Sequence, residues 1–383
     1  MNPISRLAVG KKRKPRTPGT VRVVVVFLAL CAQLLLMAYM VLLLRQTVYL
    51  YFYLQIAGAV VMTVIITRNR NSSYTIAWLI IMMIMPVFGY LLFFLWGTTG
   101  LSNHKRTRIK AHIEHGQTFL TPDQPTHAQF LARHPARKKL GTYLQNEGFP
   151  IYQHTQSRYF PLGELQFEQL TADLEQAQKY IFLEYFIIAE GQLWDRIHDV
   201  LRRKARQGVE VRILIDDMGS IDRLPDTFVP ELQSEGIQAA RFNQVNQNIF
   251  RLLINNRDHQ KITVIDGNIG YTGGTNIADE YVNLTHPLGQ WKDVAIRLEG
   301  AAVWALTVTF LQMWDAETDL QSDYLRYRPT SQVDGRGFYQ PFADGPINRT
   351  HQQSAQPGRG TLPPDHCRRP TLRLYNHSVP DHR

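Results

Sequence analysis

The chain has 383 residues, 44% of them hydrophobic, and a formal net charge of +10 at pH 7. This length holds a membrane module and one soluble domain of typical size. The positive charge suits an anionic partner, either nucleic acid or an acidic lipid surface, and charge alone does not choose between them. The two cysteines, Cys31 and Cys367, are far apart and imply neither a disulfide framework nor a zinc site.

The first hundred residues predict a basic N-terminal tail (1–20) followed by a membrane module (21–100) of two to three transmembrane helices. Apolar runs at 21–44, 48–67 and 75–96 are each near the ~20 residues needed to cross a bilayer core. A secretory signal peptide is disfavoured, because the first run is long, lacks a small-residue cleavage site and is followed at once by another. The sequence therefore predicts a multi-pass protein of the cell membrane, and membrane segments argue against a nucleic-acid partner.

The basic residues on either side of the apolar runs give conflicting topology signals. Five basic residues between 11 and 16 place the amino terminus in the cytoplasm, and four between 105 and 110 place the following segment there too. Three full spans cannot satisfy both signals. Either one apolar segment is re-entrant or interfacial, or the domain that follows faces outward. We favour the cytoplasmic face for that domain.

After a polar linker at 101–150, residues 151–345 have the pattern of an α/β domain. A strand-like run at 179–188, a helical run at 192–207 and a buried strand at 209–215 predict a βαβ unit, and hence a partly parallel sheet. Further strands are expected at 238–242, 259–265 and 269–273, with an amphipathic helix at 301–314 packing on top. The predicted fold class is thus α/β, a mixed sheet flanked by helices.

Two residues in the strand predicted at 259–265 carry the strongest chemical signal. His259 and Lys261 are two apart, so on a strand their side chains share a face with Cα atoms roughly 6 to 7 Å apart. An imidazole attacks phosphorus or moves a proton near neutral pH, while an ammonium stabilises charge on phosphoryl oxygens. The pair therefore predicts chemistry on a phosphodiester.

The residues that follow this pair complete the pattern. Asp266 falls on a hairpin-type turn signal, off the face of His259, and is assigned a role in fixing the turn and the local charge balance. Gly273 and Gly274 allow backbone to approach a ligand, and Asn276 offers an amide to a phosphate oxygen. Each element alone more often has an ordinary structural role, and only the combination is a strong signal.

The combined pattern, His-x-Lys, four residues, Asp, six residues, Gly-Gly and then Asn, resembles the HKD motif of the phospholipase D superfamily. The apolar stretch at 71–97 and several segments of the domain resemble the bacterial cardiolipin synthase branch. These segments are FLEYFII (182–188), GVEVRILIDDMGS (208–220), GTNIADEY (274–281), QWKDVAIRLEG (290–300) and YQPFAD (339–344). The resemblance covers roughly residues 45 to 345.

The resemblance implies that a histidine attacks a phospholipid phosphodiester to form a phosphatidyl-histidine, while a second histidine protonates the departing alcohol. A second alcohol then resolves the intermediate. In cardiolipin synthases both lipids are phosphatidylglycerol, and the products are cardiolipin and glycerol. No cofactor is required, and the sequence contains no evident set of metal ligands.

Carried over to this chain, the resemblance makes His259 the nucleophile or general acid, Lys261 and Asn276 phosphate ligands, and Asp266 the third motif residue. Asp293 resembles the acidic residue that orients the histidine of the opposite half.

Two further residues are assigned to the substrate site. Gly274 is expected to line it, and Glu184, centred in an apolar strand, is either a site carboxylate or a paired buried charge.

The family uses two HKD motifs, one from each half of a pseudo-dimer, and this sequence has one His-x-Lys. Residues 346–383 are rich in Pro, Arg, His and Gln and have no apolar periodicity. We expect this segment to be an aberrant end on a truncated gene, the alternative being a natural disordered basic tail. A homodimer is one way to supply the second motif.

The sequence therefore predicts a membrane-bound phosphatidyltransferase of the cardiolipin synthase type that acts on phosphatidylglycerol and other anionic phospholipids. Two alternatives remain open: a phospholipase D-type hydrolase, in which water intercepts the phospho-histidine, and a catalytically silent membrane protein.

Overall fold

The computed structural model describes residues 72–93, 103–244 and 257–343 except Gln332, together with most of 27–39 and single positions between 49 and 63. The predicted tails at 1–20 and 346–383 lie outside these residues. The chain divides into two units, residues 1–100 with 245–255 and residues 101–244 with 256–383. The predicted catalytic residues all belong to the second unit.

The first unit contains helices α3 (Ser72–Ile84) and α4 (Pro86–Leu92). They are separated at Met85, whose φ of −131° and ψ of 76° are non-helical, as expected before a proline. Gly89 lets α4 pack closely on α3, because an added Cβ would lie 2.8 Å from the Met82 Cα atom. The predicted third span is thus interrupted by Pro86, which has no amide hydrogen to continue the helix.

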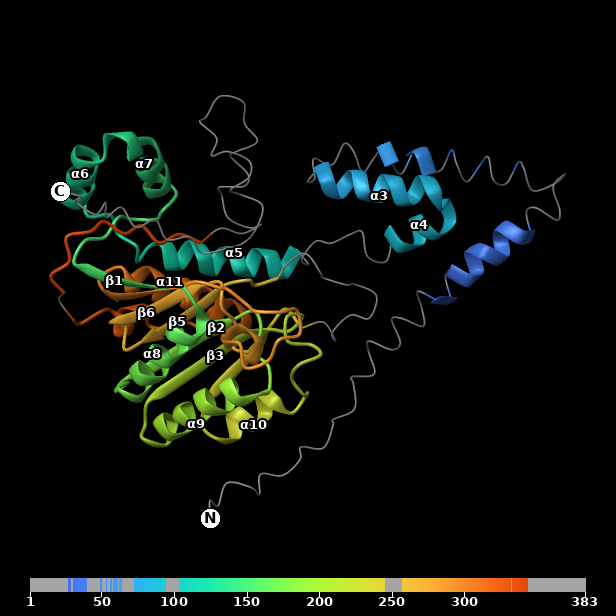
Figure 1. The fold of residues 1–383 in the computed structure, drawn as a ribbon. Coiled ribbons are helices and arrows are strands. Elements are labelled where there is room, and N and C mark those ends of the chain that lie inside the picture. The colour runs from blue at the N-terminus through green and yellow to red at the C-terminus, as the bar shows by residue number, and fades with distance from the viewer. Residues whose placement is uncertain are drawn as a thin grey trace, which may run out of the picture. The chain divides into compact units, whose positions relative to one another are not determined.

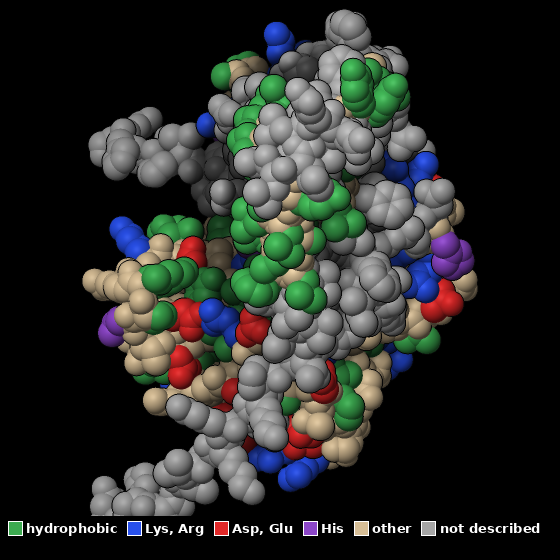
Figure 2. All heavy atoms as spheres, turned by 90° about the vertical axis from the view of Figure 1, so that its right-hand side faces the viewer, with side chains coloured by type: hydrophobic (Ala, Val, Ile, Leu, Met, Phe, Trp, Pro, Cys, Tyr) green, Lys and Arg blue, Asp and Glu red, His purple; other side chains and the backbone are tan. Residues whose placement is uncertain are grey.

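Among the residues that the structure describes, no helix is at once long and apolar enough to cross a bilayer. The predicted spans at 21–44 and 48–67 fall largely outside these residues. The described positions of the first unit expose large apolar side chains, including Leu35 at 71%, Met83 at 68% and Ile84 at 72%. Hydrophobic side chains are also prominent on the face drawn in Figure 2.

The second unit is built on a seven-stranded mixed sheet with the order β1-β7-β6-β5-β2-β3-β4. Strands β2, β3 and β4 pair in parallel, and the other neighbours pair antiparallel. The strands are β1 (Thr155–Phe160), β2 (Tyr180–Tyr185), β3 (Glu210–Asp216), β4 (Gln238–Phe242), β5 (Lys261–Ile265), β6 (Ile269–Gly273) and β7 (Ala295–Gly300). The predicted βαβ unit is therefore present as β2, α9 and β3.

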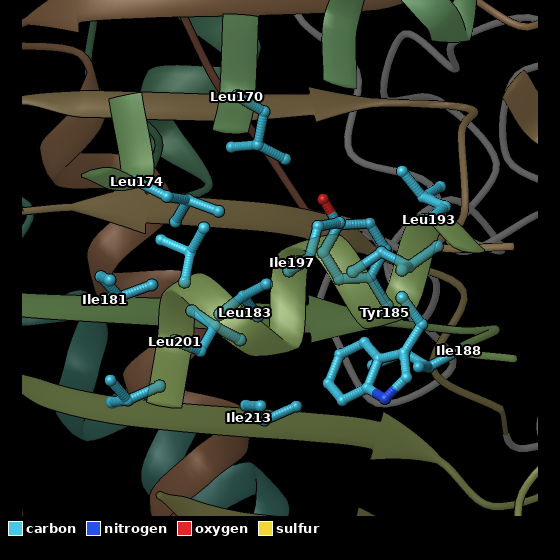
Figure 3. Packing of buried hydrophobic residues seen from close by; sticks show 14 of the residues in the cluster. Leu170, Leu174, Ile181, Leu183, Tyr185, Ile188, Leu193, Ile197, Leu201 and Ile213 are labelled. Atoms are coloured by element: carbon cyan, nitrogen blue, oxygen red, sulfur yellow. The ribbon is translucent and has the colours of Figure 1, made fainter. Parts of the chain in front are cut away.

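Helices cover both faces of this sheet (Figure 1). One face carries α8 (Gly163–Glu175), α9 (Gln192–Arg206) and α10 (Phe228–Ser234). Figure 3 shows Leu170 and Leu174 of α8 and Ile197 and Leu201 of α9 facing the strand residues Ile181, Leu183 and Ile213. The shorter helices η4 (Asp279–Val282) and η5 (Tyr324–Tyr327) lie in the connections around the sheet.

The opposite face carries α11 (Val303–Thr318), which differs from the amphipathic helix predicted at 301–314. Helix α11 is buried nearly all round, because α5 (Asn103–Gln117) packs against its side away from the sheet. The Trp304 indole donates to the Phe119 carbonyl, and the Gln312 amide donates to the Ile113 carbonyl. An apolar helix of this kind is expected only where a second element covers it.

The segment 101–150 is therefore not the polar linker expected from its composition. It contains α5, α6 (Gln124–Arg133), η2 (Pro135–Arg137) and α7 (Lys138–Asn146), and it belongs to the second unit. Helix α5 has only a few buried positions, such as Ile109, and charged residues on its other sides. The apolar stripe of α5 is narrow and lies among many basic residues. An assignment based on composition therefore did not predict this helix.

We predict that Phe310→Ala lowers the free energy of unfolding by about 3–5 kcal/mol. The Phe310 ring is fully buried and stacks on Phe182 of β2 at a centroid distance of 4.6 Å, so its loss leaves a cavity between α11 and the sheet. Urea unfolding of the detergent-purified chain measures this. The exposed control Leu320→Ala should change stability by less than about 0.5 kcal/mol, and equal effects of the two variants would contradict the prediction.

Candidate active site

Lys261 is the first residue of β5, the middle strand of the sheet, and His259 lies two residues before it, so the strand predicted at 259–265 begins at Lys261. The Lys261 ammonium donates a hydrogen bond of 2.8 Å to the His259 carbonyl oxygen, and its Nζ lies 3.3 Å from His259 Nδ1. The Phe186 ring packs on both, with its centroid 4.7 Å from the imidazole centroid and 5.2 Å from Nζ. The imidazole and the ammonium therefore lie together beside Phe186, although only Lys261 belongs to the strand.

The Lys261 ammonium is nearly excluded from water, with 4% of the residue exposed. Burial lowers its pKa to about 8, although the carboxylates of Asp258, Asp293 and Asp216 oppose this shift. Lys261 thus remains largely protonated at pH 7. A buried cation surrounded by carboxylates at moderate distance is suited to bind an oxyanion. The negative charge of the oxyanion then neutralises the ammonium.

Gly274 and Asp293 form a neighbouring wall. An added Cβ at Gly274 would overlap the Asp293 carboxylate, so a side chain at this position would displace that carboxylate. The Trp291 indole donates to Asp293 Oδ2 at 3.0 Å, and the Asn283 amide holds the Trp291 backbone through its N–H and its carbonyl. Asp293 is thereby held close enough to influence the pKa of Lys261.

Asn276 is buried on the connection that follows β6. Its Oδ1 accepts a hydrogen bond of 2.9 Å from the Ile187 amide, and its side chain also interacts with the Tyr281 hydroxyl. The backbone contact uses the amide oxygen, so Nδ2, a donor, is the atom with the right polarity for a phosphate oxygen. Its role as a phosphate ligand remains a prediction.

Asp266 lies at the other end of β5, away from His259. Its carboxylate accepts hydrogen bonds of 2.7 to 2.9 Å from the amides of Gln178, Lys179 and Tyr180 at the start of β2. Asp266 and Gly267 both have positive φ, 53° and 70°, as a tight turn between β5 and β6 requires. This placement matches the turn-fixing role inferred from sequence, while a direct catalytic role stays a prediction.

Glu184 lies on β2, paired with Ile262 of β5, and is fully buried. Burial, followed by the effect of the neighbouring Asp258 carboxyl, raises the pKa of Glu184 well above its usual value. Burial also raises the pKa of Asp258. The two carboxyls act on each other in opposite directions, since Asp258 raises the pKa of Glu184 and Glu184 lowers that of Asp258, so a proton shared by the pair is favoured on Glu184. Of the alternatives that the sequence left open, the geometry favours a paired buried group.

Three residues next to the site were not singled out from the sequence: Phe186, Asp216 and Asp258. Asp258 directly precedes His259, and Asp216 directly follows the buried strand predicted at 209–215, so a charged residue at either place was the available signal. Among the described residues, no group of three or more His, Cys, Asp or Glu is arranged to hold a metal ion.

The mixed sheet, with a His-x-Lys pair on its middle strand and a Gly-Asn segment beside it, is the arrangement of a phospholipase D-like domain. Residues 170–314 match the family described as "Cardiolipin synthase, PLD-like domain", and residues 57–97 match "Phospholipase_D-nuclease N-terminal". Residues 170–314 therefore form a phospholipase D-like domain of the cardiolipin synthase type, as the sequence resemblance predicted.

Several curated bacterial proteins are similar to this chain. A cardiolipin synthase of Geobacillus kaustophilus is 34% identical over 74% of this chain and 57% of its own length. An uncharacterized protein of Streptococcus mutans is 35% identical over 74% of this chain and 62% of its own length. The chain thus spans about 60% of the length of these relatives.

Among solved structures, a phosphatidylserine synthase of Haemophilus influenzae is similar with a TM-score of 0.38 and 14% identity. The match covers 54% of this chain and 53% of that one. An overlap of this size supports no inference about function.

We predict that Asp266→Ala lowers the free energy of unfolding by about 1–3 kcal/mol, because three amides lose a charged acceptor and alanine is strained at positive φ. Asp266→Asn, which keeps one acceptor and tolerates positive φ, should lose less. Chemical denaturation measures both variants. An alanine variant as stable as the wild type would show that the three hydrogen bonds to the Asp266 carboxylate contribute nothing to the free energy of unfolding.

We also predict that oxyanion binding weakens as pH rises through about 8, because Lys261 then loses its proton. If only the ammonium form binds, affinity for tungstate should fall about tenfold between pH 7 and pH 9 by calorimetry. Lys261→Arg should abolish the decline, since arginine stays charged throughout. The control Lys292→Ala, at an exposed neighbouring position, should retain it. A wild-type affinity that is flat with pH would refute the assignment.

Proposed function

We propose that this chain transfers a phosphatidyl group between two phosphatidylglycerol molecules, giving cardiolipin and glycerol, with His259 as the nucleophile. The observation that carries the proposal is the buried Lys261 ammonium 3.3 Å from the His259 imidazole. The similarity to proteins named cardiolipin synthase supports the choice of lipid. Lys261, Asn276 and the Gly274 backbone are assigned to the phosphate, and Asp293 to orienting the histidine of a second half.

In the first step, a ring nitrogen of His259 attacks the phosphorus of one phosphatidylglycerol. Nδ1 faces Lys261, so Nε2 is the nitrogen assigned to the attack, which requires the tautomer with its proton on Nδ1 and the ammonium bonded to the His259 carbonyl oxygen. The bond from phosphorus to the headgroup glycerol oxygen breaks, and that oxygen takes a proton from a general acid to leave as glycerol. The Lys261 ammonium compensates the charge that gathers on the phosphoryl oxygens.

In the second step, a headgroup hydroxyl of another phosphatidylglycerol attacks the phosphatidyl-histidine. Its proton passes to the group that acted as general acid, and the bond from phosphorus to His259 breaks. The product is cardiolipin, and both catalytic groups return to their starting protonation states. If water attacks in place of the lipid hydroxyl, the product is phosphatidic acid, which defines the hydrolytic alternative.

The general acid is assigned to the His259 of a second copy of the chain. The carboxylate of Asp293, fixed by Trp291, would then orient the partner imidazole. We expect such a homodimer to be a weak catalyst, because the family interface joins two non-identical halves. The same reasoning makes a catalytically silent protein the outcome if the copies do not associate.

The proposed setting is the cell membrane, with the chain crossing it more than once and the second unit on the cytoplasmic side. The apolar runs of the first hundred residues and the exposed apolar side chains at Leu35, Met83 and Ile84 support contact with lipid. The net charge of +10 suits an anionic lipid surface.

The test is an assay of the full chain, purified in detergent with its mass measured, on phosphatidylglycerol vesicles. We expect cardiolipin from the dimer fraction, loss of at least about a thousandfold in His259→Ala, and wild-type activity in His286→Ala, an exposed histidine of the 283–294 loop. Phosphatidic acid as the main product would favour hydrolysis. Activity in a strictly monomeric preparation would refute the dimer, and activity that survives His259→Ala would refute the nucleophile.

A further inference from the structure

Asp216, the last residue of β3, is a fully buried carboxylate that contacts only donors among its described hydrogen-bond partners. Oδ1 accepts from the amides of Met218 at 2.9 Å and Gly219 at 3.0 Å, and lies 3.4 Å from an Arg257 guanidinium nitrogen. Oδ2 accepts from the Asp258 amide at 2.9 Å. This carboxylate therefore joins the loop after β3 to the backbone that leads into His259.

The contact with Asp258 restrains the residue immediately before His259. The Asp258 side chain in turn accepts a hydrogen bond of 3.0 Å from the Gln260 amide, so it bridges across His259. The backbone on either side of the imidazole is thus held, by Asp216 on one side and by Asp258 on the other. The Arg257 guanidinium adds a further anchor by donating to the Asn243 carbonyl at 3.0 Å.

The other end of the Asp216 network reaches the ring that packs on His259. Gly219, whose amide Asp216 holds, lies against the Phe186 carbonyl so closely that a Cβ would overlap it. The next residue, Ser220, accepts a hydrogen bond of 3.0 Å from the Ile188 amide through its Oγ. Phe186 is thereby placed with its centroid 4.7 Å from that of the imidazole.

We propose that Asp216 is a positioning residue that fixes the His259 imidazole, acting through the Asp258 amide on one side and through the Gly219 to Phe186 contact on the other. It touches neither substrate nor phosphorus. Its effect is to limit the orientations open to the ring beside the Lys261 ammonium, since a small displacement of a reacting group is costly for catalysis. The proposal rests on the proposed role of His259.

Asp217 provides a matched control because it is adjacent, equally buried and also paired with an arginine. Its Oδ1 lies 3.1 Å from an Arg241 guanidinium nitrogen, and Arg241 also donates to the Pro225 carbonyl, so this pair binds the connection toward α10. Asp216→Asn places an amide NH₂ group among N–H donors that need an acceptor. Asp217→Asn likewise places an NH₂ group against the Arg241 guanidinium. A purely structural role predicts the same consequences for both variants.

The experiment uses full-length protein in detergent and two readouts. The first is the rate at which diethylpyrocarbonate modifies His259, followed by mass spectrometry with the exposed His286 as internal reference. We expect Asp216→Asn to raise the His259 rate at least threefold, because the ring is no longer held against Phe186 and Lys261. Asp217→Asn should leave it at the wild-type value. An unchanged rate in Asp216→Asn, or equal changes in both variants, would overturn the proposal.

The second readout is turnover of phosphatidylglycerol, where Asp216→Asn should lower kcat at least tenfold with KM within twofold of wild type. If the wild-type chain is inactive on this lipid, the proposed function fails while the labelling result still decides the role of Asp216. If Asp216→Asn does not fold, Ser220→Ala, which removes the hydroxyl that bonds the Ile188 amide and the Phe186 carbonyl, tests the side of the proposal that acts through Phe186. It should raise the labelling rate in the same direction, and no change there would equally overturn the proposal.

Discussion

The contact between the Lys261 ammonium and His259 is the interaction on which the site depends. The charge of a lysine that is almost excluded from water must be stabilised by other groups. Here the His259 carbonyl and three carboxylates stabilise it. None of the three makes a tight ion pair with it among the described contacts, so a phosphoryl group remains a strong partner. Burial lowers the pKa of Lys261 to about 8 and the three carboxylates oppose a larger shift, so the side chain keeps its charge at neutral pH.

The position of β5 in the sheet explains how two such groups are held together. The strand is paired on both sides, antiparallel to β2 and to β6, and both faces of the sheet are covered by helices. A strand so constrained cannot slip by a residue without exchanging its two faces. Lys261 takes its side from the pairing of residues further along, such as Thr263 with Leu183, and its contacts with His259 hold the imidazole beside it.

Local patterns in the sequence were enough to locate the strands that matter. The strands predicted at 238–242 and 269–273 are β4 and β6 with the same bounds, and the turn at Asp266 and Gly267 follows from residues that tolerate positive φ. What local patterns could not supply were contacts between distant segments. Asp216 meets Asp258 across 42 positions, and α5 meets α11 across about 200. Neither contact produces a periodic pattern in the sequence. Which segments meet depends on the order of the strands in the sheet and on which face of the sheet a helix covers.

The spacing within the motif also has a mechanical meaning. The interval from His259 to Asp266 includes the whole of β5, which rises roughly 3.3 Å for each residue, with His259 and Lys261 at one end and the Asp266 contacts to β2 at the other. The interval between Lys261 and Asp266 thus sets a length, and the four residues inside it are buried, so both their number and their type are constrained. One inserted residue would turn Lys261 toward α11 or separate Asp266 from its three amides. Length changes here should therefore be far less tolerated than conservative substitutions.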